Sequence, residues 1–134
     1  MRTRFVVAAA LALAAPASAQ VTRLGGGTAP LFVSGSPTLG GTLSISPLFA
    51  PLPLVILGLS RVDLPLASLG ASCPDVLIPN LDFSNYLNYT LPIPNDPVFV
   101  GATVYAQGAM VGVAPCRVFG VYVAMTEAVE IRVQ

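Results

Sequence analysis

Acidic and amide side chains near predicted turns are the residues of this sequence best suited to chemistry. Asp75, Asp82 and Asp96 lie nearest to the expected loops. Two such carboxylates can act as acid and base on a glycosidic bond. Together with Asn80 and Asn95 they also offer the hard oxygen ligands that calcium prefers, although they lack the regular spacing of a known calcium loop. The alternative is that all five residues form turns, which short polar side chains favour.

A second candidate site is aromatic and would bind sugars. Tyr86, Asn88 and Tyr105 lie in or beside predicted strands. An exposed tyrosine has an amphipathic ring that can stack on a sugar ring. The alternative is that these tyrosines pair across strands, as tyrosines commonly do in β-sheets. The absence of tryptophan weighs mildly against a sugar-binding platform.

The residue types that are missing exclude several reactions. The chain contains no histidine and no lysine. Without histidine it cannot form a Ser-His-Asp triad, and two cysteines alone cannot complete a four-cysteine zinc site. Without lysine it cannot form a phosphate-binding P-loop. The sequence therefore predicts a protein that is not an enzyme and has no cofactor, with calcium as the open alternative.

Charge is sparse after the first 20 residues, where four arginines face six acidic residues for a formal charge of −2. Nucleic-acid binding needs a basic footprint, and none is present. A polybasic patch for a membrane surface is also missing. A surface with so few charges suits close association with another molecule. The expected partners are a second copy of the chain, a cell-envelope protein or a polysaccharide.

The N-terminus has the features of an export signal. Arg2 and Arg4 precede an apolar run, and a small-residue cleavage site ends at Ala19. Residues 1–19 are therefore predicted to be a signal peptide, with an uncleaved membrane anchor as the alternative. A secreted, cell-surface or periplasmic protein is expected. The remaining chain has no apolar run long enough to span a bilayer, and residues 20–30, which include Gly25–Gly27, are expected to form a flexible lead-in.

The two cysteines, Cys73 and Cys116, are expected to form a disulfide. An exported protein meets an oxidising compartment, where an even number of cysteines favours pairing. The alternative is two buried free thiols, because sequence alone does not show that the two positions come close.

Residues 31–134 are predicted to form a single domain of short strands separated by turns. Every second residue from Val98 to Ala106 is apolar, which predicts a long strand over 98–107. Other strands are expected at 54–60, 64–69 and 86–93 and, near the end, at 118–125 and 129–133. The segment 54–60 is apolar on both faces, which predicts a central strand. About eight or nine strands, at a spacing of roughly 8–12 residues, are typical of a sandwich. The expected fold is an all-β antiparallel sandwich with a Greek-key or jelly-roll-like path.

The chain contains the segments Ser36-Pro37-Thr38-Leu39-Gly40, Gly70–Cys73, Ile93–Pro97 and Val129–Val133, together with Gly101, Tyr105 and Gln107. These segments resemble a family of small, functionally uncharacterised secreted β-sandwich modules found in exported proteins of planctomycetes and similar environmental bacteria. The resemblance spans most of residues 20–134, although each motif is only weakly specific. It implies a fold and an extracellular address, but no reaction.

These observations favour a non-enzymatic structural or interaction module that is secreted or held at the cell surface. A carbohydrate-binding module, with or without calcium, is the first alternative. A small outer-membrane β-barrel is the second, although the chain ends on Gln134 rather than on an aromatic residue and shows no aromatic girdles.

Overall fold

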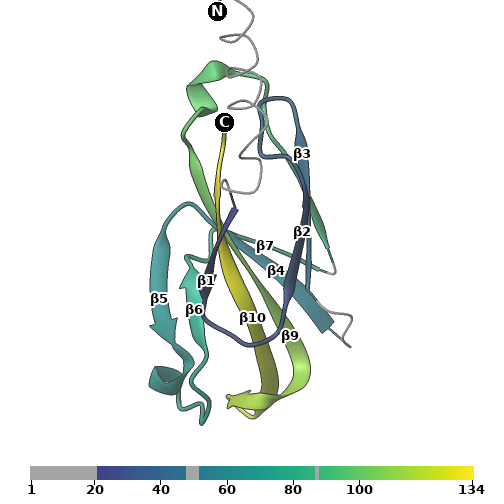
Figure 1. Ribbon diagram of the computed structural model, residues 1–134. Helices are drawn as coiled ribbons and strands as arrows, with labels where there is room; N and C mark the ends of the chain where they lie inside the picture. The colour runs from purple at the N-terminus through teal and green to yellow at the C-terminus, as the bar shows by residue number, and fades with distance from the viewer. Residues whose placement is uncertain (1–20, 48–51, 87) are drawn as a thin grey trace, which may run out of the picture.

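The computed structural model describes residues 21–47, 52–86 and 88–134, which form ten β-strands and two short 3-10 helices (Figure 1). Every pairing between these strands is antiparallel, so the predicted all-β sandwich is confirmed. The elements are β1 (Val21–Gly25), β2 (Leu31–Gly35), β3 (Thr42–Pro47), β4 (Leu52–Gly58), β5 (Arg61–Pro65), η2 (Leu66–Leu69), β6 (Val76–Pro79), β7 (Phe83–Tyr86), β8 (Tyr89–Pro92), η3 (Pro97–Phe99), β9 (Thr103–Val118) and β10 (Val121–Arg132).

The long hairpin of β9 and β10 lies in the middle of a five-stranded sheet with the order β1-β10-β9-β4-β7. A three-stranded sheet with the order β2-β3-β8 packs against one face of it. Residues of both sheets meet in a buried apolar cluster, because alternate side chains of a strand point to the same face. This cluster contains Leu31, Leu43, Ile45, Val55, Leu57, Ile93, Ala106, Val129, Ile131 and Val133.

The opposite face of the five-stranded sheet is covered by the hairpin of β5 and β6 and by η2 (Figure 1). A second buried cluster forms there. With an apolar layer on each face, β4 must be apolar on both faces, as the sequence predicts for a central strand. The second cluster contains Ile56, Leu66, Ala71, Cys73, Leu77, Ala109, Cys116 and Met125.

The expectation of a flexible lead-in over residues 20–30 is wrong for the described part of that segment. Val21–Gly25 form β1, which pairs with β10 at the edge of the large sheet. The glycines after β1 allow a close approach of two backbones. A Cβ atom on Gly27 would lie 2.1 Å from the carbonyl oxygen of Met125. The glycine run therefore lets the chain pass close over β10. The prediction of a flexible segment was wrong because the composition of this run is the same as that of a linker.

The strand predicted over 98–107 is also wrong in its first half. The side chain of Asp96 accepts a hydrogen bond from the backbone N–H of Val98, and Pro97 begins η3. Both features favour the start of a helical turn. Val98 and Val100 are exposed, and β9 begins only at Thr103. In the same way, the strand expected over 64–69 divides into the end of β5 and the 3-10 helix η2.

Residues 1–19, the predicted signal peptide, lie outside the described residues, so that prediction stays open. In the described ranges, no helix is long and apolar enough to cross a membrane.

Candidate functional site

The three aspartates predicted as calcium ligands lie in three separate connections. Asp82 precedes β7, and its carboxylate accepts a hydrogen bond of 2.9 Å from the backbone N–H of Leu59. Asp96 precedes η3 and caps it. Asp75 precedes β6 and is buried. Each carboxylate accepts a hydrogen bond from a neighbouring backbone, and the structure does not bring the three together, so calcium binding stays a prediction without a shared site.

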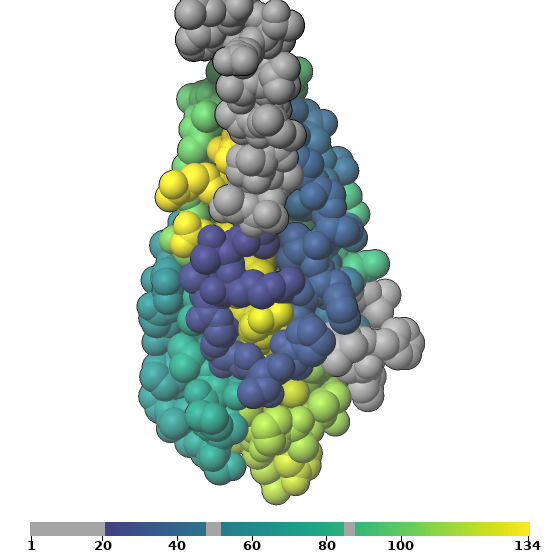
Figure 2. All heavy atoms as spheres, in the orientation of Figure 1, coloured from purple at the N-terminus to yellow at the C-terminus, as the bar shows by residue number. Residues whose placement is uncertain are grey.

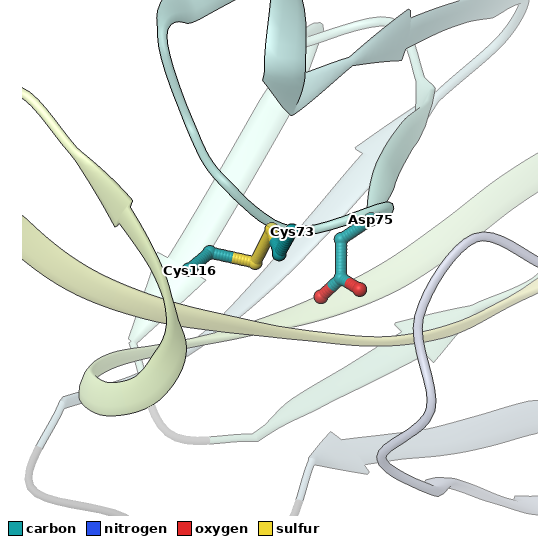
Figure 3. A group of neighbouring side chains, drawn as sticks. All are labelled: Cys73, Asp75 and Cys116. Carbon is teal, nitrogen blue, oxygen red and sulfur yellow. A yellow bond between two sulfur atoms is a disulfide. The ribbon is translucent and has the colours of Figure 1, made fainter.

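Asp75 lies beside the disulfide between Cys73 and Cys116 (Figure 3). Asp75 is only 5% exposed, and its carboxylate accepts a hydrogen bond of 3.2 Å from the backbone N–H of Met125. The possible ligand atoms of these two cysteines and Asp75 lie within 4.8 Å of one another. Both sulfurs are bonded to each other, which confirms the predicted disulfide and leaves no thiolate to bind a metal. The group is therefore a structural staple.

The predicted sugar-binding residues lie on β7, on β9 and in the connection after β7. Tyr86 is the last residue of β7 and pairs with Leu54 of β4. Asn88 is exposed in the connection to β8. Tyr105 is half-buried on β9, where it pairs with Gly58 and Glu130. These positions neither show that the three residues form a shared binding platform nor exclude it. The prediction of carbohydrate binding therefore stays open.

Gln107 is fully buried and serves as a hydrogen-bonding centre between three strands. Its side-chain amide donates to the carbonyl oxygens of Val76 and Thr126, each at 2.9 Å. Its amide oxygen accepts from the backbone N–H of Ile78 at 2.9 Å. Two of these bonds tie β6 to β9, and the third joins β9 to β10. A buried amide with partners at both ends is a structural element rather than a free binding group.

A pocket of about 280 Å³ opens where the edges of the two main sheets meet. The sequence interpretation did not identify it. Its walls are almost entirely apolar, and Asp82 is its one charged side chain. The rings of Phe83 and Tyr89 lie within it at a centroid distance of 5.0 Å. The lining residues are Leu57, Gly58, Leu59, Asp82, Phe83, Tyr89, Leu91 and Val104.

The tip of the β9–β10 hairpin is the second surface that the sequence interpretation missed. Phe119 and Gly120 form its two-residue loop, with φ angles of 49° and 81°. Phe119 is 84% exposed, and Val121 and Tyr122 beside it are about half exposed. The guanidinium carbon of Arg117 lies 5.5 Å from the centre of the Tyr122 ring. Figure 2 shows this tip uncovered at the end of the molecule.

Comparisons with protein-family models, with curated proteins and with solved structures each found no match. The resemblance to secreted β-sandwich modules therefore stays a prediction. The pocket and the hairpin tip are two apolar surfaces of the described residues that are open to another molecule.

Proposed function

We propose that this chain is a non-enzymatic interaction module that associates with further copies of itself through the tip of the β9–β10 hairpin. One observation carries the proposal: Phe119, a large apolar side chain, is 84% exposed at a position where it costs stability.

The backbone conformation of Phe119 is unfavourable for its side chain. Two positive φ angles in a two-residue hairpin loop match a type I′ turn, for which Asn-Gly and Asp-Gly are preferred. A bulky residue at positive φ is an outlier, and strain of this kind costs on the order of 1 kcal/mol. Because Phe119 packs against little of its own chain, contacts within one molecule do not offset this strain energy. Strained residues of this kind cluster at functional surfaces.

The neighbouring side chains enlarge the apolar tip. Val121 and Tyr122 follow the turn, and Arg117 stacks on Tyr122. Arginine and the aromatic side chains, including tyrosine, are enriched at the centres of protein interfaces. The tip offers few groups that could satisfy the hydroxyls of a sugar, so a protein partner suits it better than a polysaccharide.

Export from the cytoplasm is part of the same proposal. The disulfide between Cys73 and Cys116 supports it, because such bonds persist in oxidising compartments. The leader-like residues 1–19 support it from the sequence. An exported, charge-poor module with an exposed aromatic tip is suited to assembly outside the cytoplasm.

The test is the self-association of the purified, oxidised chain lacking residues 1–19, measured by sedimentation velocity over a concentration series. The wild-type chain should form larger species as concentration rises. Phe119→Asn should remain a monomer and should be at least as stable as the wild type, because asparagine tolerates positive φ. Loss of association with no loss of stability would show that the substitution removes an intermolecular contact and does not act by unfolding the chain.

The matched control is Val98→Asn, which replaces another exposed apolar residue with the same side chain. Val98 is 76% exposed and lies in η3, at the end of the molecule away from the hairpin tip (Figure 1). This variant should associate like the wild type. A wild-type chain that stays monomeric at every concentration, or a Phe119→Asn variant that still associates, would overturn the proposal.

A further inference from the structure

We infer that the hairpin tip of one copy inserts into the pocket of the next copy, so that the chains assemble head to tail. This inference rests on the proposed function, since it names the surface that receives Phe119. In this arrangement the side chain of Phe119 enters the pocket lined by Phe83 and Tyr89, and Arg117 meets Asp82 at its edge.

The size and chemistry of the pocket fit an aromatic ring. A closed apolar cavity of about 150 Å³ accommodates benzene, and this pocket measures about 280 Å³. Its two aromatic rings lie 5.0 Å apart and tilted by 49°. A third ring can join such a pair edge to face, which is a preferred aromatic geometry. Leu59, which is 74% exposed, gives the opening an apolar rim.

The charges at the two surfaces are complementary. Asp82 is the one charged residue of the pocket lining, and no ion pair links it to a cation within the described residues. Arg117 on the hairpin likewise forms no ion pair with a described carboxylate, and its guanidinium rests on Tyr122. Arg117 and Phe119 are two positions apart at the same end of the hairpin. An arginine beside the inserted ring would therefore bring a positive charge to the negative edge of the pocket.

The two surfaces lie at opposite ends of β9, so they cannot meet within one molecule. Val104, in the pocket wall, is the second residue of β9, whereas Phe119 follows its last residue. The stretch from Tyr105 to Val111, which pairs without interruption with β4, alone spans roughly 20 Å at the usual rise of a strand. A contact between two different surfaces at opposite ends is heterologous, and repeating it adds copies end to end.

The pocket side is tested with Leu59→Asp, which puts a charge on the exposed rim, and with Phe83→Ala, which removes one aromatic wall. Each should lower the association constant at least tenfold in sedimentation velocity, as is expected for Phe119→Asn. Circular dichroism and the denaturation midpoint show whether each variant is folded. Leu59→Asp is the safer variant, because its side chain is mostly exposed and contributes little to the core.

A mixing experiment separates head-to-tail assembly from a symmetric contact between two tips. Phe119→Asn keeps its pocket and loses its aromatic tip, whereas Leu59→Asp keeps its tip and loses its pocket rim. Each alone should be monomeric, but an equimolar mixture should form a heterodimer and nothing larger. The charge contact is tested with Arg117→Glu, which should also weaken wild-type association, because it would face Asp82.

The outcomes distinguish this inference from the proposed function. If Leu59→Asp and Phe83→Ala associate like the wild type while Phe119→Asn does not, the pocket is not the receptor, and only the head-to-tail inference is overturned. If Phe119→Asn associates like the wild type, both are overturned. A heterodimer in the mixture supports both.

Discussion

At the residue scale, the buried side-chain amide of Gln107 should make a large contribution to the stability of the fold. Its three hydrogen bonds satisfy two carbonyl oxygens and one N–H in the interior. Each buried polar group left without a partner costs about 1–3 kcal/mol. We expect Gln107→Leu to lower the free energy of unfolding by about 3 kcal/mol or more, measured by urea denaturation. Gln134→Leu is the matched control, because the side chain of Gln134 is exposed.

A Gln107→Leu variant as stable as the wild type would show that this site tolerates unpaired backbone groups, for example by admitting water. The sequence indicated Gln107 only as part of a resemblance. Its partners Val76, Ile78 and Thr126 lie on two other strands, 19 to 31 residues away along the chain. Local patterns carry no information about contacts at that separation, so the role of Gln107 could not be predicted.

The same limit applies to Phe119. A Phe-Gly pair lacks the composition of a hairpin turn, because Asn-Gly and Asp-Gly are the usual signals. The apolar sequence around it instead favours a continuous strand. The exposed aromatic tip can be identified only once it is known that Val118 pairs with Val121, which leaves Phe119 and Gly120 as the turn.

At the scale of elements, the disulfide holds the loop before β6, and with it the β5–β6 hairpin, against β9. It joins residues 43 positions apart. A loop of that length gives a stabilisation of roughly 4 kcal/mol in the chain-entropy treatment. We expect the double variant Cys73→Ala/Cys116→Ala to lose an amount of this order in urea denaturation, and to be cleaved first within residues 59–82 by a low concentration of protease.

The control is the wild-type chain with and without a reductant. Reduction should lower the wild-type midpoint and leave that of the double variant unchanged. An unchanged midpoint for the double variant would mean that the apolar cluster around Leu66, Leu77 and Met125 holds the hairpin without the covalent bond.

Most strands other than β1 were predictable from the sequence, but the limits of the strands were not. The apolar character of 54–60 on both faces correctly indicated a central strand, because both faces of β4 are covered. The segments 118–125 and 129–133 were expected as two strands, yet β10 runs without a break from Val121 to Arg132. The register shift between Met125 and Ala128 explains the change in apolar pattern that suggested a boundary, since a bulge changes which face a side chain occupies.

At the scale of the whole molecule, the small number of charged residues predicts that self-association depends only weakly on salt concentration. The described residues carry four arginines and six acidic residues, and three close ion pairs use six of these ten charges. Association through an aromatic ring in an apolar pocket depends on burial, which moderate sodium chloride does not screen. An exposed ion pair such as Arg117 with Asp82 contributes up to about 1 kcal/mol, equivalent to about a fivefold change in the association constant.

Raising sodium chloride from about 50 mM to about 500 mM shortens the screening length severalfold, so it should weaken self-association by no more than that fivefold factor. Arg117→Gln should associate more weakly than the wild type and should lose this residual salt dependence. Sodium sulfate at moderate concentration should strengthen association in both, because it favours burial of apolar surface. A hundredfold loss of association in sodium chloride would instead indicate a contact made mainly by charges, which would contradict assembly through Phe119 and the pocket.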